Sequence, residues 1–153
     1  MSIRHLQVIG AIAIRLFSRK YALNHESISS LVCHLLDVMT AENLPEWEQQ
    51  GARQDLTGRG DPLPPDLEKL IPSGLRKDFY TLVECAVEIG LSSMYGASTE
   101  QALYFVKKTQ QILRKHNIEG LDDLASKYLH CSRLSWGKPF GEDEVEQFRS
   151  LFN

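Results

Sequence analysis

The chain lacks the features that would place it in a membrane, in a disulfide scaffold or on nucleic acid. Its apolar run at residues 8–14 is far shorter than the ~20 residues needed to cross a bilayer, so no membrane span is expected. Three cysteines cannot all pair within the chain, which argues against a disulfide framework and favours a reducing, cytoplasmic setting. A net charge of −3 argues against direct nucleic-acid binding, which normally uses a basic patch.

Motifs of the commonest enzyme classes are also missing. The sequence contains no GxSxG, P-loop, HExxH or dinucleotide-binding fingerprint. A cysteine nucleophile needs a histidine and an orienting acid or amide, and no local signature selects one of the three cysteines. The chain is therefore predicted not to be an enzyme, and no cofactor is expected.

No segment alternates apolar and polar residues with the β-branched enrichment of a strand, so an all-α fold is predicted. Apolar residues recur instead at helical spacing along most of the 153 residues. With 42% hydrophobic and 24% charged residues, the chain fits one compact domain over residues 1–153. About six or seven helices are expected in it.

The most apolar segment is residues 73–96. When its residues are placed at ~100° steps, only Lys77, Glu84 and Glu88 mark a polar side. A helix that is apolar almost all round is usually buried, so residues 73–96 are predicted to be the central helix. Ser73 is expected to cap this helix, and Ser98 to cap the next one through a capping box.

The one long irregular segment is a loop rich in glycine and proline at residues 51–65. Glycine weakens a helix and proline cannot continue one, so this segment is predicted to connect helices. Unstructured connections of this length are uncommon, which makes the loop a candidate functional segment. It contains Arg59, Gly60 and Asp61, the tripeptide read by integrins, a match that is frequent by chance.

Acidic residues gather beside both tryptophans. The first cluster surrounds Trp47 and the second follows Trp136 at the start of the last predicted helix; the acids are Glu42, Glu46 and Glu48, and Glu142, Asp143, Glu144 and Glu146. Acids in a first helical turn complement the helix dipole, but four exceed what capping requires. An aromatic side chain flanked by acids is typical of an interface with a basic partner. The alternative is that both tryptophans are core anchors with solvated acids nearby.

Two further groups of residues bear on metal binding or catalysis. Glu84 and Glu88 share one helix face, where they can act in acid–base chemistry, ligate a metal, meet a partner's basic group or form a solvated strip. The pairs Cys33-His34 and His130-Cys131 offer soft ligands. Adjacent helical residues point ~100° apart and converge poorly on one ion, so no metal site is predicted.

The charge is unevenly distributed along the chain. The first 25 residues hold four basic residues and no acid, which leaves 13 basic and 20 acidic residues in the remainder. An acidic body attracts a basic partner through long-range steering.

Three short segments of the second half carry a family likeness: residues 87–90 (VEIG), 93–97 (SMYGA) and 136–140 (WGKPF). In them the chain resembles the small helical immunity proteins of bacterial contact-dependent and other polymorphic toxin systems. The resemblance implies a cytoplasmic inhibitor that binds a cognate toxin, often a nuclease. It transfers no toxin-contact residue.

The sequence as a whole favours a cytoplasmic, protein-binding inhibitor of a basic toxin domain. The expected partner-binding residues are the acids and tryptophans described above: Glu42, Glu46, Trp47, Glu48, Glu84, Glu88, Trp136, Glu142, Asp143, Glu144 and Glu146. The alternatives are a helical ligand- or metal-binding domain or enzyme using Glu84 and Glu88, and an adaptor that does not inhibit its partner. A homodimer is also open, because Val8, Ile12 and Leu23 on the first helix can form a dimer seam or face a packed neighbour.

Overall fold

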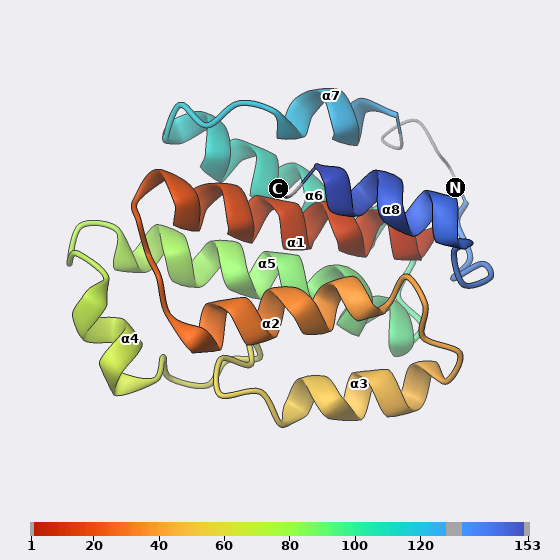
Figure 1. Cartoon of the computed structure of the whole chain (residues 1–153), viewed down its shortest axis with the longest axis horizontal. Coiled ribbons are helices and arrows are strands. Elements are labelled where there is room, and N and C mark those ends of the chain that lie inside the picture. The colour runs from red at the N-terminus through yellow and green to blue at the C-terminus, as the bar shows by residue number, and fades with distance from the viewer. Residues whose placement is uncertain (1, 128–132, 152–153) are drawn as a thin grey trace.

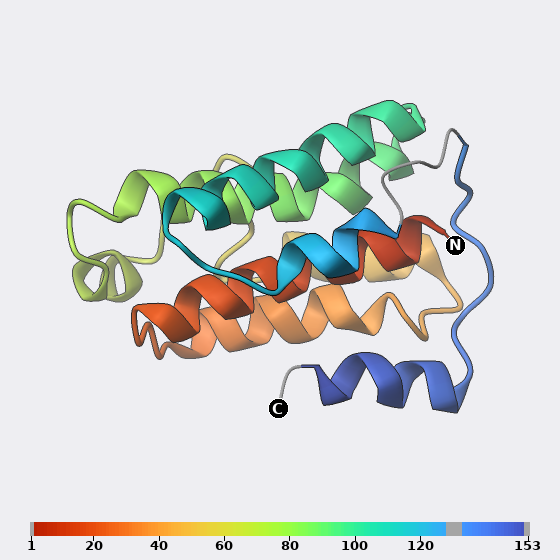
Figure 2. The ribbon, with the colours of Figure 1, turned by 90° about the horizontal axis from the view of Figure 1, so that it is seen from above.

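Two long helices, α1 (Ile3–Lys20) and α5 (Arg76–Met94), lie side by side in the middle of the molecule (Figures 1 and 2). The structure, a computed structural model, describes residues 2–127 and 133–151. Within those residues the chain forms eight helices and no strand, which confirms the predicted all-α class. The prediction of a central helix at residues 73–96 is confirmed for α5, but α1 is equally central.

The central position of α1 was obscured in the sequence by two polar residues on its buried side. Arg4 and Gln7 are both buried, and each is satisfied by backbone groups of other segments. The Gln7 amide donates to the Ala86 carbonyl at 2.8 Å and accepts from the Gly90 amide at 2.9 Å. Gln7 therefore binds two backbone groups one turn apart on α5, and these bonds offset the cost of removing its amide from water.

Glycine allows α1 and α5 to approach closely. A Cβ on Gly10 would lie 3.1 Å from the Ala86 carbonyl oxygen and 3.2 Å from the Ala86 Cα. Contacts this short with backbone leave no room for a side chain, so Gly10 sets the distance between the two central helices.

The remaining helices surround this pair. They are α2 (Glu26–Asp37), α3 (Leu44–Ala52), α4 (Pro65–Leu70), α6 (Thr99–Lys115), α7 (Leu121–Ser126) and α8 (Glu142–Ser150). Helix α6 packs on both central helices, α2 and α7 pack on α1, and α3 packs on α2 and α5. No helix among the described residues is long and apolar enough to span a bilayer.

Helix starts follow the sequence signals in part. Asn43 caps α3 as its side chain accepts from the Glu46 amide at 3.0 Å. The predicted Ser73 cap is wrong, because α5 begins at Arg76 after a turn, and Ser98 precedes α6 without a side-chain capping bond. Asn117 adopts a left-handed conformation after α6, with φ of 54°.

The loop predicted at residues 51–65 runs from residue 53 to residue 64. It is not free in solvent, because Leu56, Thr57 and Gly58 are buried. Gly58 has a φ of 65°, and a Cβ there would lie 2.6 Å from Val87 of α5. Glycine thus provides both a left-handed turn and the space for the loop to pack on the central helix.

The apolar residues Val8, Ile12 and Leu23 all lie buried in the core. They face packed neighbours within the chain. The alternative of a dimer seam through these three residues is therefore wrong.

Arg4 ties the N-terminus of α1 to two distant segments. Its guanidinium donates to the carbonyls of Val38 and Ala41 beyond α2, and its Nε lies 3.5 Å from the Gly137 carbonyl oxygen. The Phe140 amide donates to the Met39 carbonyl at 2.7 Å. These bonds bring the turn before α3 and the segment before α8 to the same end of the molecule, the right-hand end in Figure 1.

Candidate functional site

Most of the predicted acidic residues lie exposed at this one end. The turn that bonds to Arg4 leads directly into Glu42 and Glu46, and the segment that bonds to Met39 leads directly into α8. We call five exposed carboxylates there the acidic end: Glu42, Glu46, Glu142, Asp143 and Glu146. None of the five has an ion-pair partner among the described residues. The segment that precedes α8 carries two exposed basic residues, Arg133 and Lys138.

Glu144 differs from its neighbours because it holds α8 in place. Its carboxylate lies 2.7 Å from His5 Nε2 of α1. The His5 ring also packs on Phe140 and Phe148, with centroids 4.4 and 5.9 Å away. Burial lowers the pKa of His5, and the Glu144 carboxylate opposes this shift. Glu144 thus anchors the helix that carries most of the acidic end.

Trp47 is a core anchor and not a surface residue. It is 5% exposed, and its indole nitrogen donates to the His34 carbonyl at 2.8 Å. The His34 ring stacks on it at 5.0 Å, and the half-buried Trp136 meets it edge-on at 6.0 Å. Trp47 therefore supports α3 from inside and does not present its ring to a partner.

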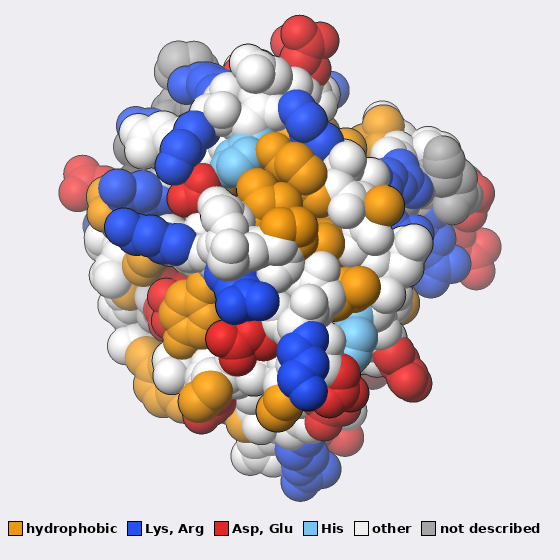
Figure 3. Space-filling model, turned by 90° about the vertical axis from the view of Figure 1, so that its left-hand side faces the viewer, with side chains coloured by type: hydrophobic (Ala, Val, Ile, Leu, Met, Phe, Trp, Pro, Cys, Tyr) orange, Lys and Arg blue, Asp and Glu red, His pale blue; other side chains and the backbone are white. Residues whose placement is uncertain are grey.

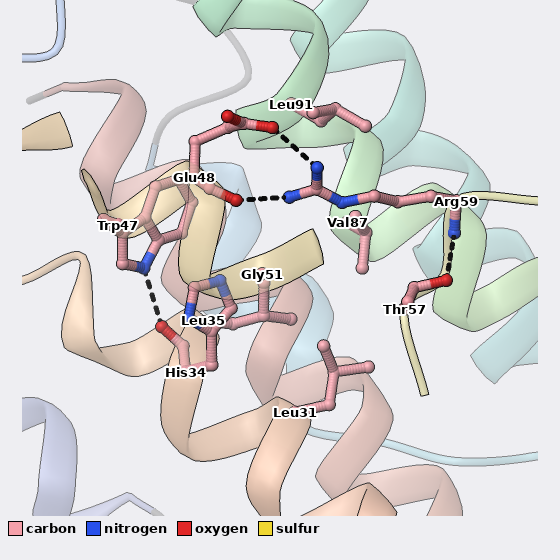
Figure 4. A pocket seen from close by; sticks show the side chains of 10 residues that line it. All are labelled: Leu31, His34, Leu35, Trp47, Glu48, Gly51, Thr57, Arg59, Val87 and Leu91. Atoms are coloured by element: carbon pink, nitrogen blue, oxygen red, sulfur yellow. Dashed lines mark hydrogen bonds and ion pairs between the residues drawn. The ribbon is translucent and has the colours of Figure 1, made fainter. Parts of the chain in front are cut away.

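Glu48 is paired with an arginine of the long loop (Figure 4). Arg59 donates from Nη1 to Glu48 Oε1 at 2.6 Å and from Nη2 to the Glu48 carbonyl at 2.9 Å. Both side chains are less than one-fifth exposed. Because Arg59 turns inward, the tripeptide that it begins is not displayed as an integrin ligand would be.

Gly51 makes room for this arginine. A Cβ there would lie 2.5 Å from Arg59 Nη2 and 2.7 Å from His34 Nε2. Burial and the positive charge of Arg59 together lower the pKa of His34 to about 4, so the ring is neutral at pH 7. The half-buried Arg59 cation and an uncharged imidazole therefore lie next to each other beside Gly51.

Glu84 and Glu88 are half-buried on the neighbouring face of α5. Burial raises the pKa of Glu88, Arg59 opposes the shift, and Glu84 reinforces it. The cavity lined by Glu48, Arg59 and Val87 holds about 10 Å³, the lower limit for a single water molecule. This cavity is too small for a substrate, and neither Glu84 nor Glu88 lines it.

The candidate metal ligands are not brought together. Cys33 is exposed while His34 is buried, so the two side chains leave α2 in different directions. The pair His130-Cys131 lies outside the described residues. No group of three His, Cys, Asp or Glu side chains within residues 2–127 and 133–151 is placed to share an ion.

The structure also contains a polar cluster that the sequence did not indicate. His116 lies 2.6 Å from the Tyr21 hydroxyl through Nδ1 and 2.7 Å from Asp78 Oδ2 through Nε2. Hydrogen bonds from Lys115 and His116 lower the pKa of Asp78. The cluster joins α1, α5 and α6 at the end opposite the acidic end, where acidic and basic side chains surround an apolar patch (Figure 3). Only the antiparallel packing of α5 on α6 brings these residues together, so their sequence spacing carries no signal.

The predicted partner-binding residues thus separate into two groups. Trp47, Glu48 and Trp136 support the inside of the fold, with Glu84 and Glu88 half-buried beside them, whereas the acidic end faces solvent. Comparison of the chain with models of protein families, with curated proteins and with solved structures found no match.

Proposed function

We propose that this chain is an inhibitor that binds a basic protein through its acidic end, as immunity proteins of bacterial toxin systems do. The observation that carries the proposal is that five exposed carboxylates from two distant segments lie at one end of the molecule, without an ion-pair partner among the described residues. Local helix capping does not account for this placement, because tertiary contacts of Arg4 and Phe140 bring the two segments together.

A surface of this kind acts on both the rate and the selectivity of binding. Uncompensated carboxylates create a negative potential that steers a basic partner and repels acidic ones. A toxin domain that cleaves nucleic acid carries a basic surface, because it must bind phosphates. The acidic end would compete for that surface and block the substrate.

The buried residues contribute indirectly. Trp47 bonds α3 to α2, the Glu48–Arg59 pair bonds α3 to the long loop, and the His5–Glu144 pair holds α8 against α1. Both acidic segments are thereby presented on fixed helices, so less conformational entropy is lost on binding.

The test is capture of the partner by matched charge variants. The tagged protein is incubated with lysate of its source organism, in parallel with the triple variant Glu142→Lys, Asp143→Lys, Glu146→Lys. The matched control is Glu26→Lys, Glu68→Lys, Glu119→Lys, which reverses three exposed acids at the opposite end without breaking an ion pair among the described residues.

We expect the wild type and the control to retain one basic protein in stoichiometric amount, and the acidic-end variant to lose it. The activity of the retained protein should fall in the complex. A partner that stays fully active would identify an adaptor, and a partner retained equally by both variants would exclude the acidic end as the interface.

A further inference from the structure

A groove of about 510 Å³ lies between α7 and α8, with α1 as its floor. Its apolar lining comes from all three helices: Ile12, Leu16, Leu124, Phe148 and Leu151. Leu151 at the end of α8 is 52% exposed and continues this apolar lining toward solvent. In Figures 1 and 2, α7 lies over α1, while α8 runs along the side of the bundle.

The groove lies between two helices of opposite direction. Helix α7 covers the top of α1 in Figure 1, and α8 runs antiparallel to α7 along another side of the bundle (Figure 2). An apolar groove between helices is the usual receptor for the apolar face of a partner helix. The volume falls within the range of ligand-binding pockets, so several anchor side chains of such a helix can enter.

The charges at the rim indicate which helix fits. Asp123 of α7 and Glu144 of α8 face the groove from opposite walls, and Lys127 is the one basic side chain in the described lining. Glu144 bonds to His5 but its side chain stays 41% exposed. Asp143 of the acidic end belongs to the same first turn of α8. An occupant with an apolar stripe flanked by lysine or arginine would match both the floor and the rim.

We infer that this groove binds an amphipathic, basic helix of the protein partner. The inference rests on the proposed function, because α8 provides both one wall of the groove and most of the acidic end. The partner's basic surface would be drawn to the acidic end, and its apolar stripe would enter between Leu124 and Leu151.

The first test uses a synthetic helical peptide of leucine and lysine at amphipathic spacing, followed by methyl NMR of the full chain. The matched control peptide has glutamate in place of lysine. We expect shifts at the methyls of Ile12, Leu16, Leu124 and Leu151 with the basic peptide, and binding weaker by at least about tenfold with the acidic one. Equal binding of both peptides would overturn the inference. Chemical-shift changes at other methyls but not at these four would overturn it as well.

The second test uses variants that leave the core intact. Leu151→Glu should abolish the methyl shifts, whereas Tyr95→Glu should leave them unchanged, because Tyr95 is 77% exposed and lies outside the groove. A concentration-dependent dimer of the wild type that Leu151→Glu dissociates would assign the groove to a second copy of the chain and contradict the inference.

The Leu151→Glu variant also separates the groove proposal from the inhibitor proposal. A captured partner that is lost from Glu142→Lys, Asp143→Lys, Glu146→Lys but kept by Leu151→Glu would overturn the groove alone. Peptide binding in the groove without capture of any basic protein would overturn the inhibitor function, while the groove would still be supported as a site for a basic helix.

Discussion

At the scale of single residues, the long loop is held by Gly58 and by the half-buried Arg59. Gly58 and Gly60 both have positive φ, but only Gly58 meets other atoms within 4 Å. We expect Gly58→Ala to lower the free energy of unfolding by about 2–4 kcal/mol, because it adds backbone strain to a clash with Val87 and Val83. Gly60→Ala adds only the backbone strain and should lower the free energy of unfolding by about 1 kcal/mol. Urea denaturation of both variants measures the difference, and equal losses would show that the loop does not pack on α5.

His34 makes the free energy of unfolding depend on pH. The unfolded ring binds a proton near pH 6.5, whereas the folded ring does so only at about 4. The unfolded chain therefore binds more protons in this window, and the free energy of unfolding should fall as the pH falls from 6.5 to 4, by up to about 3 kcal/mol. His34→Phe keeps a ring against Trp47 and should flatten this part of the profile. Parallel profiles of the two proteins would refute the assignment.

In this region the sequence indicated which residues are important, but it did not indicate most of the contacts that they make. Trp47 was expected either in the core or at an interface, and the structure places it in the core. The Glu48–Arg59 pair was not foreseen, since it depends on the loop folding back over α3. No periodic pattern encodes a contact of this kind.

At the scale of elements, α8 is attached to the rest of the molecule by a small set of side chains. Phe140, Val145 and Phe148 enter the core beneath it, and the His5–Glu144 pair adds one polar tie. Phe148→Ala removes the ring that stacks on Phe140 at 5.7 Å, a change that costs about 3–5 kcal/mol in a well-packed core.

We expect this variant to release α8 while the central helices stay folded. Amide hydrogen exchange should then rise throughout α8 and remain slow in α1 and α5. A uniform rise in all helices would show instead that α8 unfolds only with the whole molecule.

The helices were predicted because their apolar residues recur at helical spacing, which local sequence determines. The same method identified α5 as central but did not show that α1 is equally central. Arg4 and Gln7 interrupt the apolar pattern of α1, and their burial becomes favourable only through backbone groups of other segments. The caps at Ser73 and Ser98 failed for a related reason, since a suitable side chain does not fix where the first turn begins.

At the scale of the whole molecule, the two acidic clusters form one charged end. Each cluster was visible in the sequence, but their proximity was not, because it depends on bonds between residues about one hundred positions apart. This gathering of charge is what links the fold to the proposed inhibitor, and its effect should be screened by salt.

The most direct measurement is the rate at which the captured basic partner associates with the wild type, with Glu142→Lys, Asp143→Lys, Glu146→Lys, and with the opposite-end control. At about 50 mM salt we expect the acidic-end variant to associate at least about tenfold more slowly than the wild type, with the gap narrowing at about 500 mM. The control should follow the wild type at both concentrations. Equal rates for the wild type and the acidic-end variant at low salt would contradict the claim that this end binds the partner.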